Sequence, residues 1–134
     1  MKDDRLYLIH IRDSIARIKQ YTKEGKEVFL TSALVQDAVM RNLQTLAESS
    51  QRLSADFRDR HPRIDWRGMR GFRNVLVHQY LGIDLARVWG IVERDLPRLK
   101  RGLSSVFKSL RYPPPTTSKR KPVSRSRARK KKKR

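Results

Sequence analysis

Four polar side chains fall close together in the segment GFRNVLVHQYLG: Arg73, Asn74, His78 and Tyr80. Histidine titrates near neutral pH and can therefore accept or donate a proton during a reaction. Arginine keeps its charge and can bind an anion such as phosphate through two parallel hydrogen bonds. These residue types suit proton transfer beside a bound anion. The structural alternative for the same residues is a buried polar cluster within a helical bundle.

The remaining two histidines, His10 and His61, show no catalytic or metal-binding pattern. His10 is expected on a helix surface, and His61 precedes Pro62 in a loop, where we expect solvent around it. The three histidines share no metal-ligand spacing, and the chain has no cysteine and no HExxH motif. We therefore predict no metal site, no disulfide and no cofactor.

The elements that carry these residues are predicted from apolar residues that recur every three or four positions. The first helix is expected over 3–22, with a break at Gly25, and the second over 27–54. The apolar stripe of the first helix consists of Leu8, Ile11, Ile15 and Ile18. Asn42 falls on the apolar face of the second helix and needs a hydrogen-bond partner there.

The rest of the domain shows the same helical periodicity. A short extra turn is expected near Phe57, and a third helix runs from its N-cap Asp65 to about Leu81. Asp84 caps a fourth helix, in which Pro97 should cause a kink or a break. No segment alternates with a period of two. The predicted fold class is therefore all-α, an antiparallel bundle of four to five helices.

Helix geometry separates the four polar residues of the third helix into two groups. Asn74 and His78 are one turn apart on one face, whereas Arg73 and Tyr80 share a different face. The backbone of one straight helix therefore does not direct Arg73 and His78 to the same point, although the long arginine stem could bend round. A two-fold contact between two copies would bring both faces into one cleft. This predicts a homodimer.

The charge of the chain is concentrated at its C-terminal end. The 134 residues contain 33 Lys+Arg and 13 Asp+Glu, a net charge of +20, and residues 111–134 hold 12 of the basic residues and no acid. We predict a helical bundle domain over 1–110 and a disordered Lys/Arg-rich tail over 111–134. The tail is expected either to tether phosphate-rich RNA or simply to keep the protein soluble, with an acidic membrane surface as a rival target.

The sequence also indicates where the protein resides. No run of about 18 apolar residues is present, which excludes a membrane-spanning helix. The first residues, MKDDRLYLIHIRDS, lack the apolar region of a signal peptide. We therefore expect a cytoplasmic protein without membrane association.

Residues 62–80, PRIDWRGMRGFRNVLVHQY, resemble the HepT-type toxins of the HEPN superfamily. The signature of those toxins is an arginine followed by a polar residue, a histidine after four intervening residues, and a tyrosine two positions later. Arg73, Asn74, His78 and Tyr80 occur in that spacing. Further similar features are Asp65-Trp66, Asp84, Trp89 and Asp95-Leu96-Pro97, so the similarity spans most of 3–107. The basic tail is not part of the family pattern.

The resemblance implies a metal-independent endoribonuclease toxin, with its site at the dimer cleft of a HEPN-like bundle. His78 is then expected as general base or general acid and Arg73 as the phosphate-binding residue. Asn74 and Tyr80 are expected to support catalysis or bind the RNA. The resemblance also implies a partner, a cognate minimal nucleotidyltransferase antitoxin that silences the toxin by adding AMP to Tyr80.

Two other functions compete with this interpretation. The first is a non-catalytic HEPN-type adaptor that binds nucleic acid or a nucleotide, which the basic tail would suit equally well. The complete set of Arg73, His78 and Tyr80 argues against it, because a protein that only binds would not require all three. The second is a DNA-binding protein, which the absence of helix-turn-helix spacing disfavours.

Overall fold

The computed structural model describes residues 2–77 and 84–110. Within those residues the chain is helical and contains no strand. The elements are α1 (Lys2–Tyr21), α2 (Lys26–Thr31), α3 (Ala33–Arg52), α4 (Ala55–Arg60), α5 (Trp66–Val77), α6 (Leu85–Gly90), the π-helical turn η2 (Ile91–Asp95) and α7 (Leu96–Leu110). The predicted all-α fold class is confirmed.

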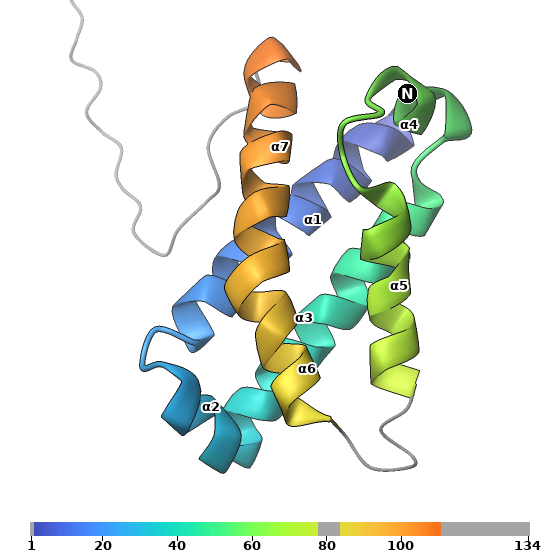
Figure 1. Ribbon diagram of the computed structural model, residues 1–134. Coiled ribbons are helices and arrows are strands. Elements are labelled where there is room, and N and C mark those ends of the chain that lie inside the picture. The colour runs from blue at the N-terminus through green and yellow to red at the C-terminus, as the bar shows by residue number, and fades with distance from the viewer. Residues whose placement is uncertain (1, 78–83, 111–134) are drawn as a thin grey trace, which may run out of the picture.

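The longer helices form two antiparallel pairs (Figure 1). Helices α1 and α3 run in opposite directions and pack along each other. Helix α5 and the continuous column formed by α6, η2 and α7 also run in opposite directions and lie across the first pair. In that arrangement α5 packs on α3, and α7 packs on α1. The short helices α2 and α4 lie at opposite ends of α3.

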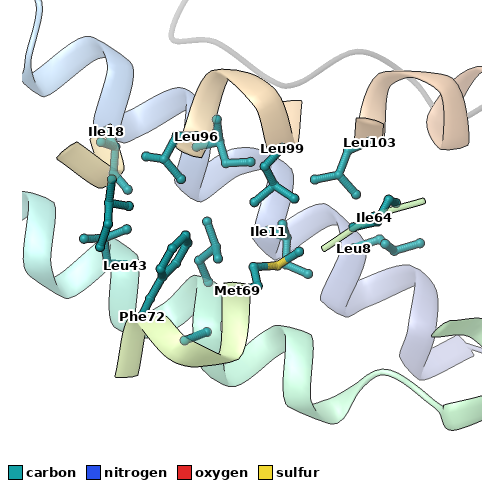
Figure 2. Close-up of a cluster of buried hydrophobic side chains, with 14 of the residues drawn as sticks. Leu8, Ile11, Ile18, Leu43, Ile64, Met69, Phe72, Leu96, Leu99 and Leu103 are labelled. Atoms are coloured by element: carbon teal, nitrogen blue, oxygen red, sulfur yellow. The ribbon is translucent and has the colours of Figure 1, made fainter. Parts of the chain in front are cut away.

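One apolar core holds these helices together (Figure 2). Ile11 of α1, Leu43 of α3, Met69 of α5 and Leu99 of α7 all contribute buried side chains to it. Burial of a side chain of this size contributes about 1.5–3 kcal/mol relative to exposure. The apolar stripe predicted for the first helix is confirmed, since all four of its members are buried.

The second predicted helix is wrong in one respect, because the structure divides 27–54 at Ser32 into α2 and α3. The Ser32 backbone is extended, and its side chain accepts a hydrogen bond from the Val35 N–H at 3.2 Å. The side-chain amide of Gln36 donates to the Phe29 carbonyl at 2.9 Å. These bonds satisfy backbone groups that a helix end leaves without intrahelical partners, so the interruption costs little.

Pro97 produces a local change in helix type instead of a break. It is the second residue of α7, and the five residues before that helix form the π-helical turn η2. Proline cannot donate to the carbonyl four residues earlier, here that of Glu93, and its ring would collide with that carbonyl in a regular α-helix. The wider π-turn is a known way of accommodating such a disturbance. The column from α6 to α7 therefore stays helical throughout (Figure 1).

The predicted helix caps are confirmed. The Asp65 carboxylate accepts a hydrogen bond from the Gly68 N–H at 2.8 Å, and Asp84 accepts one from the Arg87 N–H at 3.1 Å. Side-chain oxygens at this position satisfy a backbone donor in the first turn, which has no intrahelical partner. Asp65 thereby fixes where α5 begins, and with it the direction in which the side chains of α5 point.

Two smaller predictions also hold. The extra turn near Phe57 is helix α4, and Phe57 is buried. Asn42 is half-buried and donates its side-chain amide to the Ala38 carbonyl at 2.9 Å, which provides the partner that its position required. The predicted end of the third helix near Leu81 and the predicted tail over 111–134 lie outside the described residues.

None of the helices in residues 2–77 and 84–110 combines the length and the apolar character that crossing a membrane would require.

Candidate functional site

Helix α5 presents an apolar face to the core and a cationic face to solvent. Met69, Phe72 and Val75 are buried, and Trp66 donates its indole N–H to the His61 carbonyl at 3.0 Å. The outward positions hold polar and small residues: Arg67, Arg70, Gly71, Arg73 and Asn74. Because the helical period fixes both faces at once, burial of the apolar residues forces the arginines outward.

An open groove lies on this outer face. Its volume is about 350 Å³. The lining residues are Gln51 of α3 and Arg67, Arg70, Gly71, Arg73 and Asn74 of α5. Two of the four predicted site residues, Arg73 and Asn74, thus line one surface, although helix geometry alone places them on different sides of α5. The groove is broad enough to include both.

Arg73 has a partner from a different helix. One of its terminal nitrogens donates to the side-chain carbonyl oxygen of Gln51 at 3.3 Å, across 22 residues of sequence. Both side chains are exposed, so the bond contributes little to stability, but it limits the orientations of the guanidinium. Gln51 is uncharged and therefore leaves the positive charge of Arg73 available to an anion.

The charge in the groove has one sign. Three guanidinium groups line it, and none of its lining residues is an acid. Guanidinium groups that line one groove repel one another, and the repulsion falls when an anion binds among them. The groove is therefore suited to phosphate, the anion that arginine binds with two parallel hydrogen bonds.

The other two predicted site residues, His78 and Tyr80, lie outside the described residues. In the sequence, His78 follows directly after the last residue of α5, four positions after Asn74.

The two other histidines have distinct surroundings. His10 is exposed on α1, as predicted, with its ring 6.3 Å from that of Tyr7. His61 is half-buried at the end of α4, and its ring lies 4.5 Å from that of Phe57. The expectation for His61 holds in part: the residue lies outside the helices, as the C-cap of α4, but it is half-buried because its ring contacts that of Phe57. Its carbonyl, which accepts the hydrogen bond from Trp66, ties it to the start of α5.

Sequence reasoning missed four residues of the groove: Gly71 and the three polar residues Gln51, Arg67 and Arg70. The two arginines were detectable, because Arg67, Arg70 and Arg73 recur every three residues on the polar side of a strongly amphipathic helix. Gln51 was not detectable, since only the packing of α5 on α3 brings it to Arg73.

Comparison with known protein families gives one match over most of the helical region. The family described as Ribonuclease HepT-like matches residues 11–106. A relative named "Probable ribonuclease HepT", from Thermococcus cleftensis, is 39% identical over 95 residues, which cover 70% of this chain and 86% of that protein.

Two proteins of Methanocaldococcus jannaschii whose names include "putative RNase" are also similar. One, also named a gamma-glutamylcyclotransferase, is 36% identical over 110 residues, which are 81% of this chain but only 50% of that protein. The other is 33% identical over 106 residues, 78% of this chain and 97% of that protein. The chain thus spans half the length of the first of these and nearly all of the second. No solved structure matches the chain.

Proposed function

The chain belongs to the HepT-like ribonuclease family, and from that premise we propose that it is a toxin-type endoribonuclease that cleaves RNA without a metal ion. The observation that carries the proposal is the acid-free groove along α5 that Arg73 and Asn74 line, on the helix that His78 follows in the sequence. That groove offers positive charge to a phosphate, and the family signature adds a proton-transfer group, His78, to the proposed site.

The proposed reaction uses the ribose as its own nucleophile. The 2′-oxygen attacks the adjacent phosphorus, the bond from phosphorus to the 5′-oxygen breaks, and one product ends in a 2′,3′-cyclic phosphate. A base takes the proton of the 2′-hydroxyl, and an acid gives a proton to the leaving 5′-oxygen. We assign one of these tasks to His78 and the stabilisation of the charged phosphate to Arg73. Asn74 orients His78 or binds phosphate, and Tyr80 positions the RNA.

A homodimer completes the site in this proposal. Each chain offers one histidine of the signature, whereas the reaction needs both a base and an acid. Two chains related by a two-fold axis supply two histidines to one cleft. A dimer that joins one unmodified chain to one His78→Ala chain keeps a single signature histidine, so it should be inactive if one cleft needs both. It should keep about half of the activity if each chain forms a complete site of its own.

The partner of the toxin is a small nucleotidyltransferase that acts as antitoxin. We propose that it transfers AMP to the hydroxyl of Tyr80, with pyrophosphate leaving from ATP. The added nucleotide brings a phosphodiester charge and a bulky base to the proposed site, so it excludes RNA by repulsion and by size. Under this proposal a Tyr80→Phe variant escapes the antitoxin.

The experiment that tests the function compares RNA, DNA and 2′-O-methyl RNA oligonucleotides of one sequence, each with and without EDTA. We expect cleavage of RNA alone, unaffected by EDTA, with 2′,3′-cyclic phosphate ends. Arg73→Ala and His78→Ala should each abolish it while the circular dichroism spectrum stays helical. Arg41→Ala, at an exposed position on α3, is the matched control and should cleave normally. Cleavage that EDTA stops, or that also consumes DNA, would overturn the mechanism.

The same experiment separates the enzyme from a binding adaptor, which the charge of the groove also favours. A chain that retains RNA but never cuts it, with or without the signature residues, is an adaptor. A chain that cuts RNA only when Arg73 and His78 are intact is the proposed nuclease.

A further inference from the structure

The outer face of α5 carries three arginines, whereas a single arginine is enough to bind one phosphate. Arg67, Arg70 and Arg73 all line the same groove. Their Cα atoms follow one another at steps of about 4.5 Å along the helix axis, because each step is three residues long. Because an arginine side chain is long and the three start from successive turns, the three guanidinium groups can each bind a separate phosphate.

The wall of the groove leaves room for a chain to pass. A Cβ atom built on Gly71 would meet nothing within 4 Å. The groove is open to solvent and has no acidic residue in its lining. A second depression begins at the same glycine, towards η2, but Asp95 lines it together with Arg87 and Arg94. The acid-free groove therefore favours binding of a polyanion, whereas the carboxylate of Asp95 partly opposes it in the second depression.

We propose that Arg67 and Arg70 form a phosphate track that holds the RNA strand next to the phosphate bound by Arg73. This inference rests on the proposed ribonuclease function and adds to it two binding residues and a substrate class. The substrate is a single strand that extends over several nucleotides, not a free mononucleotide. Because guanidinium groups that contact phosphates do not read base edges, the track adds affinity without base preference.

The track predicts a defined salt dependence. For single-stranded nucleic acid, each phosphate contact makes the logarithm of affinity fall with the logarithm of salt concentration by a slope of about 0.7. Loss of two contacts should therefore reduce the slope by about 1.4 and weaken binding roughly tenfold or more at low salt. The groove arginines act on substrate binding, so their effect on RNA affinity can be measured with a protein that does not cleave RNA.

The test is fluorescence anisotropy with a labelled oligouridylate over a range of NaCl concentrations. Every protein carries His78→Ala in the full chain, so the RNA stays intact and the basic tail is the same throughout. The test variant adds Arg67→Gln and Arg70→Gln. The charge-matched control adds Arg17→Gln and Arg41→Gln, at exposed positions on α1 and α3. A third variant, Arg67→Lys with Arg70→Lys, keeps the charge and guards against a folding defect.

We expect the Gln pair in the groove to lose affinity and slope while the control pair and the Lys pair keep the slope. An oligodeoxyuridylate should lose affinity in parallel, since the track contacts phosphates. Equal losses for the two Gln pairs would overturn the track, even if the unmodified chain cleaves RNA. A loss confined to the groove pair upholds the track as an RNA-binding surface, even if the unmodified chain cleaves nothing.

Discussion

Gln51 and Arg73 join two helices at the rim of the cationic groove, through a single hydrogen bond of 3.3 Å between side chains 22 residues apart. The bond connects the last turn of α3 to the outer face of α5. An arginine on a free helix surface samples many side-chain conformations, and ordering it costs conformational entropy when a substrate binds. Gln51 reduces that cost in advance, and it does so without neutralising the charge.

Substitution of Gln51 should therefore change activity more than stability. Gln51→Ala removes the partner of Arg73, and we expect kcat/KM for RNA cleavage to fall roughly threefold to tenfold, within what misplacing a positioned group can cost. Gln51→Glu should reduce it further, because a carboxylate at 3.3 Å would pair with the guanidinium and repel phosphate. Steady-state cleavage kinetics and thermal unfolding of the three proteins provide the measurement.

Which of the two substitutions, Gln51→Ala or Gln51→Glu, is more damaging distinguishes a structural role from a positioning role. A purely structural role for Gln51 would make alanine the more damaging change and would lower the melting temperature. A positioning role makes glutamate the more damaging change and leaves the melting temperature nearly constant, since both side chains are exposed.

The features that the sequence predicted correctly depend on residues that are close together in the chain. Asp65 and Asp84 were identifiable as caps because the backbone N–H groups that they accept from, those of Gly68 and Arg87, lie three residues further along the chain. The apolar stripe of α1 was identifiable because apolar residues spaced by three and four positions share one face of a helix, and that face is the one that is buried.

What the sequence did not predict depends on distant residues. The interruption at Ser32 was not predicted because the apolar spacing over 27–54 is compatible with one long helix. Phe29 is buried and packs on Trp89, with ring centroids 5.5 Å apart, and this contact with α6 holds α2 at its own angle. The groove was not predicted for the same reason, because its lining includes the Gln51 side chain from α3. Periodicity along one helix contains no information about which side chain of another helix lies beside it.

A second long-range bond pair, between Asp4 and Ser54, stabilises the fold. The Asp4 carboxylate accepts from the Ser54 N–H and from the Ser54 hydroxyl, both at 2.7 Å, and Asp4 is buried. The same hydroxyl oxygen accepts from the Phe57 N–H at 3.1 Å and thereby caps α4. One carboxylate thus fixes the start of α1 against the junction of α3 and α4, which are 50 residues away in sequence.

Stability should therefore depend on pH through Asp4. Burial alone would raise the pKa of this carboxyl, but the two hydrogen bonds from Ser54, with help from the charge of Arg60, lower it below the ordinary value of 3.8. The folded state thus binds this proton less readily than the unfolded state does. The stabilisation is complete above the ordinary pKa and is lost as the pH falls through the lowered pKa of the folded state.

Asp4→Asn tests this relationship. At neutral pH we expect a loss of about 1–3 kcal/mol in the free energy of unfolding, because one Ser54 donor would then face an amide N–H group. The difference from the unmodified chain should shrink in acid, where Asp4 itself becomes protonated. Urea unfolding at several pH values measures both effects. Asp56→Asn is the control, since Asp56 lies in an exposed ion pair with Arg60 at 3.2 Å, and its loss should be much smaller. Equal losses for the two variants at neutral pH would remove the special role of Asp4.

Two glycines of α5, Gly68 in its first turn and Gly71 near its middle, should respond differently to alanine. Gly71 is helical, and a Cβ there would meet nothing within 4 Å, so Gly71→Ala should stabilise the helix by about 0.5–1 kcal/mol. At Gly68 a Cβ would fall within 2.7 Å of the Asp65 carboxyl carbon. That carboxylate must then move away from the Gly68 N–H, and loss of a cap costs about 1 kcal/mol. The cost cancels the gain in helix propensity, so Gly68→Ala should fall below Gly71→Ala by about that amount.

Function should follow the opposite order at Gly71. The methyl group of Gly71→Ala projects into the groove between Arg67 and Asn74, so RNA binding should weaken although the protein becomes more stable. Urea unfolding and oligouridylate anisotropy on the same two variants measure the pair of effects. Stability and RNA affinity that rise together in Gly71→Ala would mean that no strand passes over this glycine. In that case the RNA would have to approach from another face of the bundle, and the arginines of α5 would serve only as a solvated surface.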